Sequence, residues 1–301
     1  MNLLSNIING KKALHDAQLD DITIVLNDDQ KHELQCVLFE IYQDILSFCE
    51  KKGFTPFLVG GSALGAGRHH GFIPWDDDLD IGMLRKEYDL FLDAFKREYS
   101  KKYIVNAPGK QERTINRFAK IIKRDTLFSD LFSVSEKELN GVFIDIFPIE
   151  NVPDSFFRRN LKGIASDAIA YIASQVSFRE NRTRLSIIAL KRTGLINYHI
   201  RKLVGFLFSF HNASWWFRSF DKVSQWKEPG HLYTIASGRK HYFGEMLSQE
   251  NVLPPQSAVF MDISVPVFHN VDSYLKRLYG NYLTIPPVEK RESHHITAFK
   301  L

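Results

Sequence analysis

The segment from residue 60 to residue 82, GGSALGAGRHHGFIPWDDDLDIG, constrains the fold of this chain more than any other part of it. It follows a short apolar run, Phe54 to Val59, that predicts a β-strand. The glycine pair then predicts a turn into a short helix from Ala63 to Ala66. A second strand is predicted from Asp78 to Leu84. The segment therefore indicates a strand, a glycine turn, a helix and a second strand in succession.

The acidic residues of this segment have the spacing of a metal site. Alternate side chains of a strand share a face, so Asp78 and Asp80 are expected to project together. Carboxylates held that close repel each other unless a cation lies between them, and Mg²⁺ and Mn²⁺ suit carboxylate oxygen. Gly60 and Gly61 let the backbone approach a ligand, and the amides from Ser62 onward predict an anion site. The residues therefore indicate a metal ion and a bound phosphate beside the glycine turn.

Each part of this pattern has a simpler interpretation when it is taken alone. Residues 60–62 are typical of a turn, and the acidic run at residues 76–78 is typical of a solvated loop. The combination favours a functional site, because the apolar neighbours Leu79 and Ile81 place the acidic run on a partly buried strand.

Strand and helix signals are intermixed over the rest of the first half. A capped helix is predicted from Asn27 to its stop at Gly53, and another is predicted from Lys86 to Tyr99. Three more strands are predicted, at Tyr103 to Asn106, Arg117 to Lys123 and Gly141 to Phe147. This mixture predicts an α+β fold built on a mixed α/β sheet.

Composition narrows the class of protein. The 301 residues are 44% hydrophobic and 25% charged, and the mean hydropathy is −0.21, as in soluble folded proteins. The two cysteines, Cys36 and Cys49, lack the spacing of zinc ligands, which argues against a disulfide scaffold and a structural metal. The N-terminal residues lack the pattern of a secretory signal. Together these observations predict a cytoplasmic protein.

The composition changes after Pro153. Residues 156–222 carry twelve Lys or Arg against three Asp or Glu, a local charge of +9 that exceeds the net +4 of the whole chain. We therefore predict three parts: a catalytic core with an N-terminal helix (1–153), a basic and apolar helical region (154–230), and a C-terminal segment that packs back on the core (231–301).

The helical region has two interpretations. In one, its Phe-rich run with Trp215 and Trp216 settles into a membrane interface while Arg and Lys meet anionic head groups, which places the protein at the inner face of the membrane. In the other, the helices pack on the core, and the Arg residues form a solvated face or bind an anionic substrate. The uncharged run from Leu203 to Phe217 is too short to span a bilayer. No nucleic-acid recognition motif is visible, and no nucleic-acid partner is predicted.

The glycine and acidic segment resembles the LicD family of phosphotransferases, which is similar to the nucleotidyltransferase fold and includes the fukutin-related proteins. The family pattern is GG-S-x-LG-x-x-R…G-x-IPWD-x-D-x-DIG. It is matched by Gly60, Gly61, Ser62, Leu64, Gly65, Arg68, Gly71, Ile73, Pro74, Trp75, Asp76, Asp78, Asp80, Ile81 and Gly82. The resemblance continues in GVFIDIFPI, where Asp145 stands in the position of a third acidic residue, and in the tail YLKRLYGNYLTIPP with a following histidine.

The resemblance implies a reaction. A CDP-activated alcohol, CDP-choline in the best-known branch, gives its substituted phosphate to a hydroxyl of a cell-surface glycan, with CMP as the leaving group. The acceptor would be a lipopolysaccharide or teichoic-acid type precursor, either free or lipid-linked. Carboxylate-held Mg²⁺ or Mn²⁺ suits such a reaction, because phosphoryl-type transfer depends on positioning and on neutralising oxygen charge.

Roles for individual residues follow from the same resemblance. Asp78 and Asp80 would hold the metal, and Asp145 would be either a shared ligand or the base that takes the acceptor proton. Asp76 would be a further ligand or would act through a ligand. These roles make Asp78, Asp80 and Asp145 the predicted catalytic residues.

Substrate contacts are predicted from Gly60, Gly61 and Ser62 at the glycine turn and from two basic residues. Arg68 could hold a diphosphate through its planar fork, and the alternative is a surface arginine. Lys120 lies in the strand RFAKIIK and is either at an edge or directed toward bound phosphate.

Other polar and aromatic residues receive structural interpretations. Trp75 could stack on a base or a ring of the substrate, but packing beside a turn is the interpretation favoured here. The histidines near the tail, His294 and His295, match a family feature that could approach the cleft, but an ordinary exposed terminus is the interpretation favoured here.

Two other functions share these residues. A true nucleotidyltransferase would move NMP from an NTP with the same metal site, and its products would differ. A catalytically silent, membrane-associated scaffold would bind nucleotide or glycan only. Three carboxylates at one point argue against the scaffold, because their mutual repulsion destabilises the fold.

Overall fold

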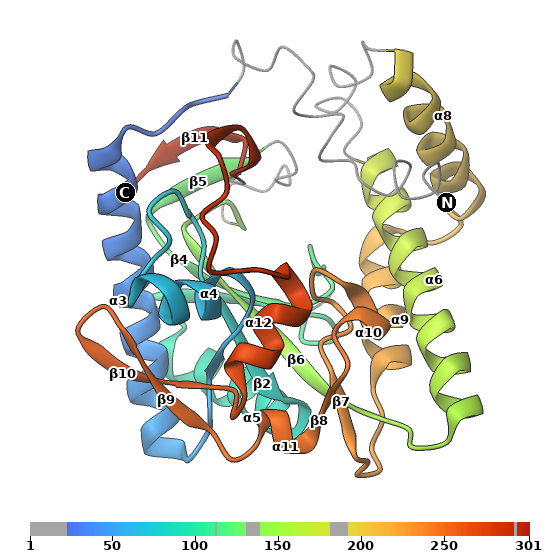
Figure 1. Ribbon diagram of the computed structural model, residues 1–301. Coiled ribbons are helices and arrows are strands. Elements are labelled where there is room, and N and C mark those ends of the chain that lie inside the picture. Colours follow the sequence, from blue (N-terminus) through green and yellow to red (C-terminus); the bar gives the residue numbers. More distant parts are fainter. Residues whose placement is uncertain (1–22, 112, 131–138, 181–191, 292–293) are drawn as a thin grey trace.

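The computed structural model describes residues 23–111, 113–130, 139–180, 192–291 and 294–301. It has an α+β fold, as predicted: a curled mixed sheet lies at the centre, with helices packed around it (Figure 1). Helix α3 (Asp28–Lys52) flanks the sheet on one side. Helices α6 (Phe156–Glu180), α8 (Arg192–Leu207) and α9 (Ala213–Ser224) stand together on the opposite side.

The predicted N-terminal helix is confirmed, with both of its ends set by local signals. The Asn27 side chain accepts a hydrogen bond from the Gln30 amide at 2.8 Å, and the Gln30 side chain accepts one from the Asn27 amide at 3.1 Å. Gly53 ends the helix in the left-handed conformation, at φ 71°. The apolar face of α3, from Leu34 to Phe48, is buried in the core.

The central sheet has the order β1-β2-β6-β4-β3. Its strands are β1 (Phe57–Leu58), β2 (Asp80–Leu84), β6 (Phe143–Val152), β4 (Ala119–Lys123) and β3 (Tyr103–Asn106). Strands β2 and β6 are parallel, and the other neighbours in this order are antiparallel. The strands confirmed here begin one or more residues later than the sequence predicts, except β3, which has the predicted bounds.

Strand β6 is long enough to pair with different strands along its two halves. Its first half pairs with β2 and β4, and its last three residues pair with β7 (Leu232–Thr234), which in turn pairs with β8 (Leu247–Ser248). Two further two-stranded antiparallel sheets are present: β9 (Gln256–Phe260) pairs with β10 (Ile263–Val267), and β5 (Leu127–Asp130) pairs with β11 (Ile296–Lys300). The C-terminal residues thus return to the first half of the chain.

Two further helices frame the glycine segment. Helix α4 (Gly60–His69) begins at the glycine pair itself, so the predicted glycine turn is the first turn of a helix. It packs against α12 (Val271–Tyr279). Helix α5 (Arg85–Tyr99) follows β2 directly and buries its aromatic face against the sheet. Shorter helices are α10 (His241–Gly244), α11 (Gln249–Val252) and the 3₁₀ turn η3 (Val288–Lys290).

A buried charge network joins the helical region to the sheet. Arg85 at the start of α5 contacts the fully buried Glu150 of β6, and its Nη2 lies 2.8 Å from Asp221 Oδ1 of α9. Burial raises the pKa of Glu150 and of Asp221, and the Arg85 charge opposes that rise. This network fixes α9, and with it the adjacent α6, beside the sheet.

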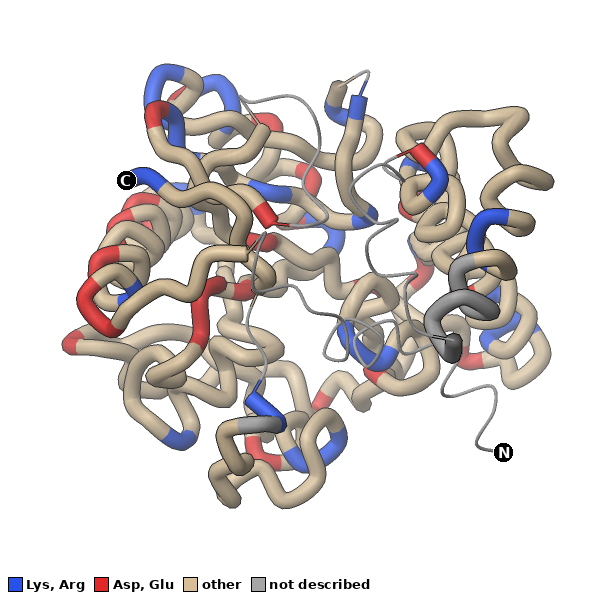
Figure 2. Tube along the Cα trace, turned by 90° about the horizontal axis from the view of Figure 1, so that it is seen from above, with Lys and Arg blue, Asp and Glu red and all other residues tan. Residues whose placement is uncertain are grey.

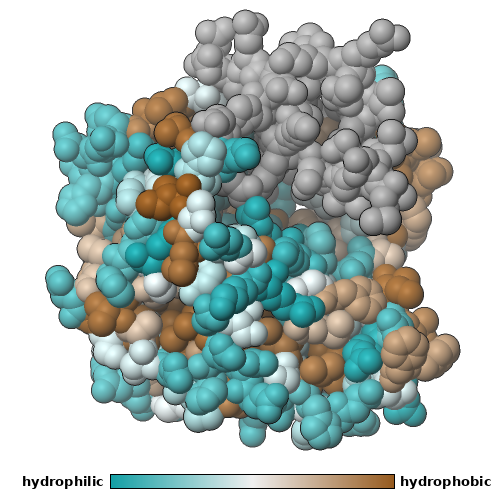
Figure 3. Space-filling view, viewed as in Figure 1, coloured by the Kyte–Doolittle hydropathy of each residue, from teal (hydrophilic) through white to brown (hydrophobic). Residues whose placement is uncertain are grey.

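The surface of the helical region combines apolar and basic residues. Lys and Arg positions recur on the helices opposite α3 when the molecule is viewed from above (Figure 2). Apolar side chains gather along the edge where α6 and α8 lie (Figure 3). In the part of the chain that the structure describes, no helix combines the length and the apolar character needed to cross a bilayer.

Candidate active site

Three polar residues stand in register across three neighbouring strands. Asp80 on β2 pairs with Asp145 on β6, and Asp145 pairs with Lys120 on β4. Directly paired residues share one face of a sheet. The fold therefore brings together side chains that lie up to 65 positions apart in the sequence, at the point where the predicted site residues were expected to meet.

The glycine pair lies directly against the acidic residues. Gly60 has a φ of +55°, and a Cβ atom there would lie 2.6 Å from Asp80 Oδ2. A Cβ atom at Gly61 would lie 3.0 Å from Asp76 Oδ2. Only glycine meets both demands at position 60, the left-handed backbone and the close carboxylate. The glycine pair thus positions the Asp76 and Asp80 carboxylates beside the first turn of α4.

Backbone and side-chain hydrogen bonds hold this arrangement. The Ser62 hydroxyl accepts a hydrogen bond from the Asp80 amide at 2.8 Å. The Gln35 side chain on α3 donates to the Asp76 carbonyl at 2.9 Å, which fixes the acidic loop. The Gly60 amide donates to the hydroxyl of the buried Tyr274 on α12 at 3.0 Å. The Gly60 amide is therefore already engaged within the protein.

The electrostatics of the cluster favour a cation. Burial, together with the charges of Asp78, Asp145 and Asp76, holds the pKa of Asp80 well above its usual range. Burial also raises the pKa of Asp78, and the Asp77 and Asp145 charges add to the rise. These carboxylates oppose one another's ionisation, and a divalent cation would relieve that repulsion.

Lys120 is a basic residue that the structure places in the cluster. Its Nζ lies 2.8 Å from Asp145 Oδ1 and 3.1 Å from the centre of the Phe143 ring. Burial raises the pKa of Asp145, while the charge and hydrogen bond of Lys120 lower it. Lys120 therefore lies on the face of the sheet that carries the acidic residues and holds the Asp145 side chain in place.

The expectation of an exposed terminus at His294 is wrong. The His294 amide donates to Asp77 Oδ2 at 2.9 Å, and its Nδ1 lies 2.8 Å from Asp77 Oδ1. Although burial alone lowers the pKa of His294, the hydrogen bond and charge of Asp77 raise it to about 10. Asp77 is buried, which excludes the simpler interpretation of the acidic run as a solvated loop at this residue. Pairing of β11 with β5 brings the tail to the site.

Carboxylates and His294 are the possible metal ligands of this site. Within the described residues, one group has ligand atoms all within 4.8 Å of one another: Asp77, Asp78 and His294. A protonated His294 offers no lone pair to a metal, and both Asp77 oxygens are engaged with His294. Asp80 and Asp145 carry the hard oxygen donors that suit Mg²⁺ or Mn²⁺, but among the described residues they do not belong to a group of this compactness. Metal binding by Asp78, Asp80 and Asp145 therefore stays a prediction.

Arg68 and Trp75 occupy positions next to the cluster. Arg68 Nη1 donates to the Tyr282 carbonyl at 2.6 Å, so this guanidinium binds the C-terminal loop. Trp75 packs against the core, and the Arg291 guanidinium lies 4.2 Å from the centre of its ring. The packing role expected for Trp75 is confirmed, and diphosphate binding by Arg68 stays a prediction.

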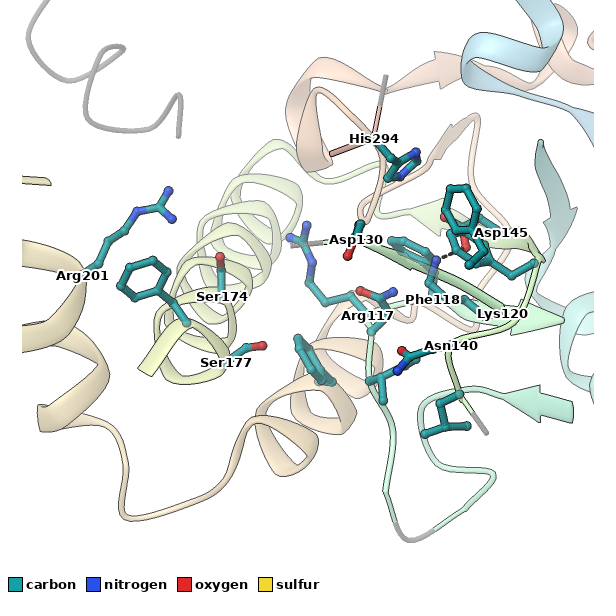
Figure 4. Close-up of a pocket in the computed structure, with 17 residues that line it drawn as sticks. Arg117, Phe118, Lys120, Asp130, Asn140, Asp145, Ser174, Ser177, Arg201 and His294 are labelled. Atoms are coloured by element: carbon teal, nitrogen blue, oxygen red, sulfur yellow. Dashed lines mark ion pairs between the residues drawn. The ribbon is translucent and has the colours of Figure 1, made fainter. Parts of the chain in front are cut away.

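A cavity of about 340 Å³ opens beside Asp145. Lys120, Asp145 and His294 lie at one side of it, and residues of α6, α8 and α9 lie at the other (Figure 4). Arg117 lies between the two sides, and Arg201 of α8 approaches from the helical side. The cavity thus connects the acidic cluster to the basic helical region.

Comparison with known proteins identifies a family domain that covers the acidic cluster. Residues 53–179 match the family described as LicD/FKTN/FKRP, nucleotidyltransferase domain. This segment of the chain is a LicD-family domain. The LicD domain contains the glycine pair, the acidic run, Lys120 and Asp145.

Relatives extend the similarity beyond that domain. The chain is 26% identical over 278 residues to the lipopolysaccharide cholinephosphotransferase LicD of Haemophilus influenzae, and this covers 88% of the chain and 95% of the relative. It is 29% identical over 121 residues to an uncharacterized protein of Rickettsia prowazekii, which covers 40% of the chain and 41% of that protein. Because the first similarity covers 88% of the chain, it extends well beyond residues 53–179.

Sequence reasoning missed several residues around the site. Asp77 and His294 belong to it through a contact between distant segments, and the tail motif was the only signal that could have found His294. Arg117 and Arg201 line the cavity, and their membership depends on how α8 packs against α6. The predicted residues 60–62, 76, 78, 80, 120 and 145 all lie in or beside the acidic cluster.

Proposed function

We propose that this chain is a phosphotransferase that moves phosphocholine, or a similar substituted phosphate, from a CDP-activated alcohol to a hydroxyl of a lipopolysaccharide-type glycan. CMP is the leaving group. The observation that carries the proposal is the alignment of Asp80, Asp145 and Lys120 on adjacent strands beside Gly60, inside a LicD domain. The similarity of nearly the whole chain to a lipopolysaccharide cholinephosphotransferase supports the choice of donor and acceptor.

The carboxylates would hold Mg²⁺ or Mn²⁺. Asp78 and Asp80 are the proposed ligands, with Asp76 as a further one and Asp145 beside them. When bound, such an ion neutralises charge on the diphosphate oxygens of the donor. The protein's own contribution is positioning: Gly60 and Gly61 set the carboxylates of Asp80 and Asp76, and Ser62 holds the backbone of Asp80. The first turn of α4 provides backbone amides toward which a donor phosphate is attracted.

Asp145 is the acidic residue best placed to take the acceptor proton. Of Asp78, Asp80 and Asp145, it is the one that lines the cavity. An acceptor hydroxyl in the cavity would give its proton to an Asp145 oxygen as the new O–P bond forms and the P–O bond to CMP breaks. Lys120 orients this side chain and limits the rise in its pKa. This assignment makes Asp145 the base while leaving it adjacent to the metal.

The helical region would dock on an anionic membrane surface, which brings a lipid-linked acceptor to the cavity. Exposed apolar side chains occur on two helices: Phe156, Phe157, Leu161 and Ile164 on α6, and Leu203, Phe206 and Leu207 on α8. Phe156 and Phe157 are each more than 70% exposed. Basic residues accompany them, with Arg158 exposed on α6 and Lys202 exposed on α8. This mixture suits the boundary between acyl chains and anionic head groups.

A product assay tests the transferase proposal. Purified protein is incubated with CDP-choline and deacylated lipooligosaccharide, with and without Mn²⁺, and CMP release and choline incorporation are measured. We expect Asp80→Asn to lower turnover by at least about a hundredfold while the protein remains folded, because Asp80 would hold the cation that neutralises negative charge on the phosphate oxygens. The matched control is Asp272→Asn, which removes an exposed carboxylate on α12.

The products distinguish the rival functions. Pyrophosphate released from CTP or ATP, with no CMP from a CDP-alcohol, would identify a nucleotidyltransferase instead. No turnover with any donor would leave a binding protein, and full activity in Asp80→Asn would refute the proposed site.

Membrane docking has a separate test. Sedimentation with vesicles that contain anionic lipid should pull the protein down at low salt, and added salt should release part of it because charge attraction is screened. Replacing Phe157 by Ser should weaken binding, since a large exposed apolar group is lost, while Leu90→Ser on α5 serves as the exposed apolar control. Equal binding to neutral and anionic vesicles, or none at all, would contradict this part of the proposal.

A further inference from the structure

Two arginines line the cavity outside the acidic cluster. Arg117 lies just before β4, and Arg201 lies on α8. Within the described residues, neither guanidinium forms an ion pair with a carboxylate. Both contact aromatic rings: Arg117 lies 5.4 Å from the centre of the Phe220 ring, and Arg201 lies 5.3 Å from that of Phe178. The charge of Asp167 acts on Arg117 from a longer distance than an ion pair and opposes part of the effect of its burial.

Two partly buried guanidinium groups that form no ion pair among the described residues would be stabilised by a bound anion. Burial lowers the pKa of Arg117 and of Arg201, because removal from water disfavours the charged guanidinium. An arginine remains charged in a protein, so the desolvated guanidinium is satisfied when it binds a planar or tetrahedral anion through its fork of N–H donors. The ring contacts orient each fork but do not neutralise it. Phe217, Ser174 and Ser177 complete this side of the cavity.

We propose that Arg117 and Arg201 form an anion subsite that binds a phosphate or carboxylate group carried by the acceptor glycan. The inference rests on the proposed function and adds a substrate class to it: the acceptor is an anionic saccharide. The cavity continues to Asp145, so a glycan held by the arginines can present a neighbouring hydroxyl to that carboxylate. The donor diphosphate belongs to the other side of the cluster, at the glycine pair and α4.

The position of Arg201 on α8 connects this subsite to the proposed membrane-docking surface, from which a lipid-linked acceptor would enter the cavity. Arg201 faces the cavity, while the neighbouring Leu203 and Phe206 of the same helix are exposed. A helix docked on a membrane through those side chains would have its cavity side beside the polar part of a lipid-linked glycan. The same helix would then serve both the lipid surface and the sugar.

Binding of small probes tests the subsite without turnover. Saturation-transfer NMR and calorimetry are performed with glucose 6-phosphate, glucuronate and glucose. We expect glucose 6-phosphate and glucuronate to bind and glucose to bind much more weakly. Arg117→Gln and Arg201→Gln should each weaken binding of the charged probes by about tenfold or more, because a charge-assisted hydrogen bond is lost. Arg97→Gln, at an exposed position on α5, is the matched control and should leave binding unchanged.

Further variants keep the test decisive. Arg117→Lys should retain part of the binding, and Arg201→Gln carries the test if Arg117→Gln fails to fold. Asp80→Asn should keep binding of glucose 6-phosphate, because the arginine subsite is separate from the acidic cluster. Unchanged binding in both Gln variants, or equal binding of glucose and glucose 6-phosphate, would overturn the inference.

Kinetics separate this inference from the proposed function. If transfer from CDP-choline is demonstrated and the Gln variants raise KM for CDP-choline but not for the glycan, the arginines serve the donor and the inference fails while the function stands. If no transfer occurs yet the charged probes still require Arg117 and Arg201, the anion subsite stands and the proposed reaction fails.

Discussion

Gly60 and Gly53 share a left-handed backbone but have different surroundings. Their φ angles are +55° and +71°, and a Cβ atom at Gly53 would meet nothing within 4 Å, whereas one at Gly60 would strike Asp80 Oδ2. Both Gly→Ala variants should lose about 1–2 kcal/mol of stability, since a side chain disfavours this conformation. Gly60→Ala should in addition lower turnover by about a hundredfold, because the Asp80 carboxylate must move.

Urea unfolding and the CMP-release assay check this pair of variants. The two variants should lose the same free energy of unfolding to within about 1 kcal/mol. Only the CMP-release assay should show a difference between them. A Gly60→Ala protein that turns over as fast as Gly53→Ala would show that the position of the Asp80 carboxylate is unimportant.

At the scale of residues, the sequence predicted those members of the site that lie in continuous motifs. Asp78, Asp80 and the glycine pair are close in the chain, and the strand around Asp145 has its own apolar pattern. Asp77 and His294 are 217 positions apart, and no local spacing links them. Their contact arises from the pairing of β11 with β5, which depends on the whole fold.

At the scale of elements, the network around Arg85 makes a prediction about stability. Arg85 neutralises the buried Glu150 and also contacts Asp221, so it joins α5, β6 and α9. Arg85→Met should destabilise the protein by about 3–5 kcal/mol, because Glu150 would remain buried without its partner.

The matched control for this change is Lys276→Met. Lys276 pairs with Asp272 on the exposed side of α12, and such pairs contribute about 0–1 kcal/mol. Chemical unfolding of the two variants gives the comparison. A loss below about 1 kcal/mol for Arg85→Met would mean that α9 is held mainly by its apolar contacts.

Helices were easier to predict than strands. Helix α3 has a capping box at one end, a left-handed glycine at the other and an apolar face between them, and all three signals are local. The C-terminal strands β7 and β8 have three and two residues, too few to show an alternating pattern. Strand β7 forms by pairing with β6, which lies about 80 positions earlier in the chain, and β8 pairs in turn with β7.

At the scale of the whole molecule, stability should depend on pH through Glu245. Burial raises the pKa of this carboxyl to about 7, against a usual value of 4.5. Between these values the folded state holds more protons than the unfolded state, so stability is full below about pH 4.5 and falls as the pH rises toward 7. The contribution of this group is on the order of 3 kcal/mol.

Comparison of wild type with Glu245→Gln isolates this contribution from that of the acidic cluster, whose raised pKa values act in the same direction. Unfolding free energies measured from pH 4.5 to pH 7.5 should decline less steeply in the variant. Parallel profiles in the two proteins would show that Glu245 is ionised throughout this range.

Strand β6 carries Asp145 in its first half and Glu150 five positions later. An odd spacing in a strand directs two side chains to opposite faces, so one strand supplies the active site on one side and the Arg85 network on the other. A one-residue insertion or deletion between them would turn one of these charges to the wrong face. The number of residues between Asp145 and Glu150 is therefore fixed by two separate functions of the strand. We expect active homologues, and active variants selected from random insertion libraries, to carry insertions and deletions outside this stretch.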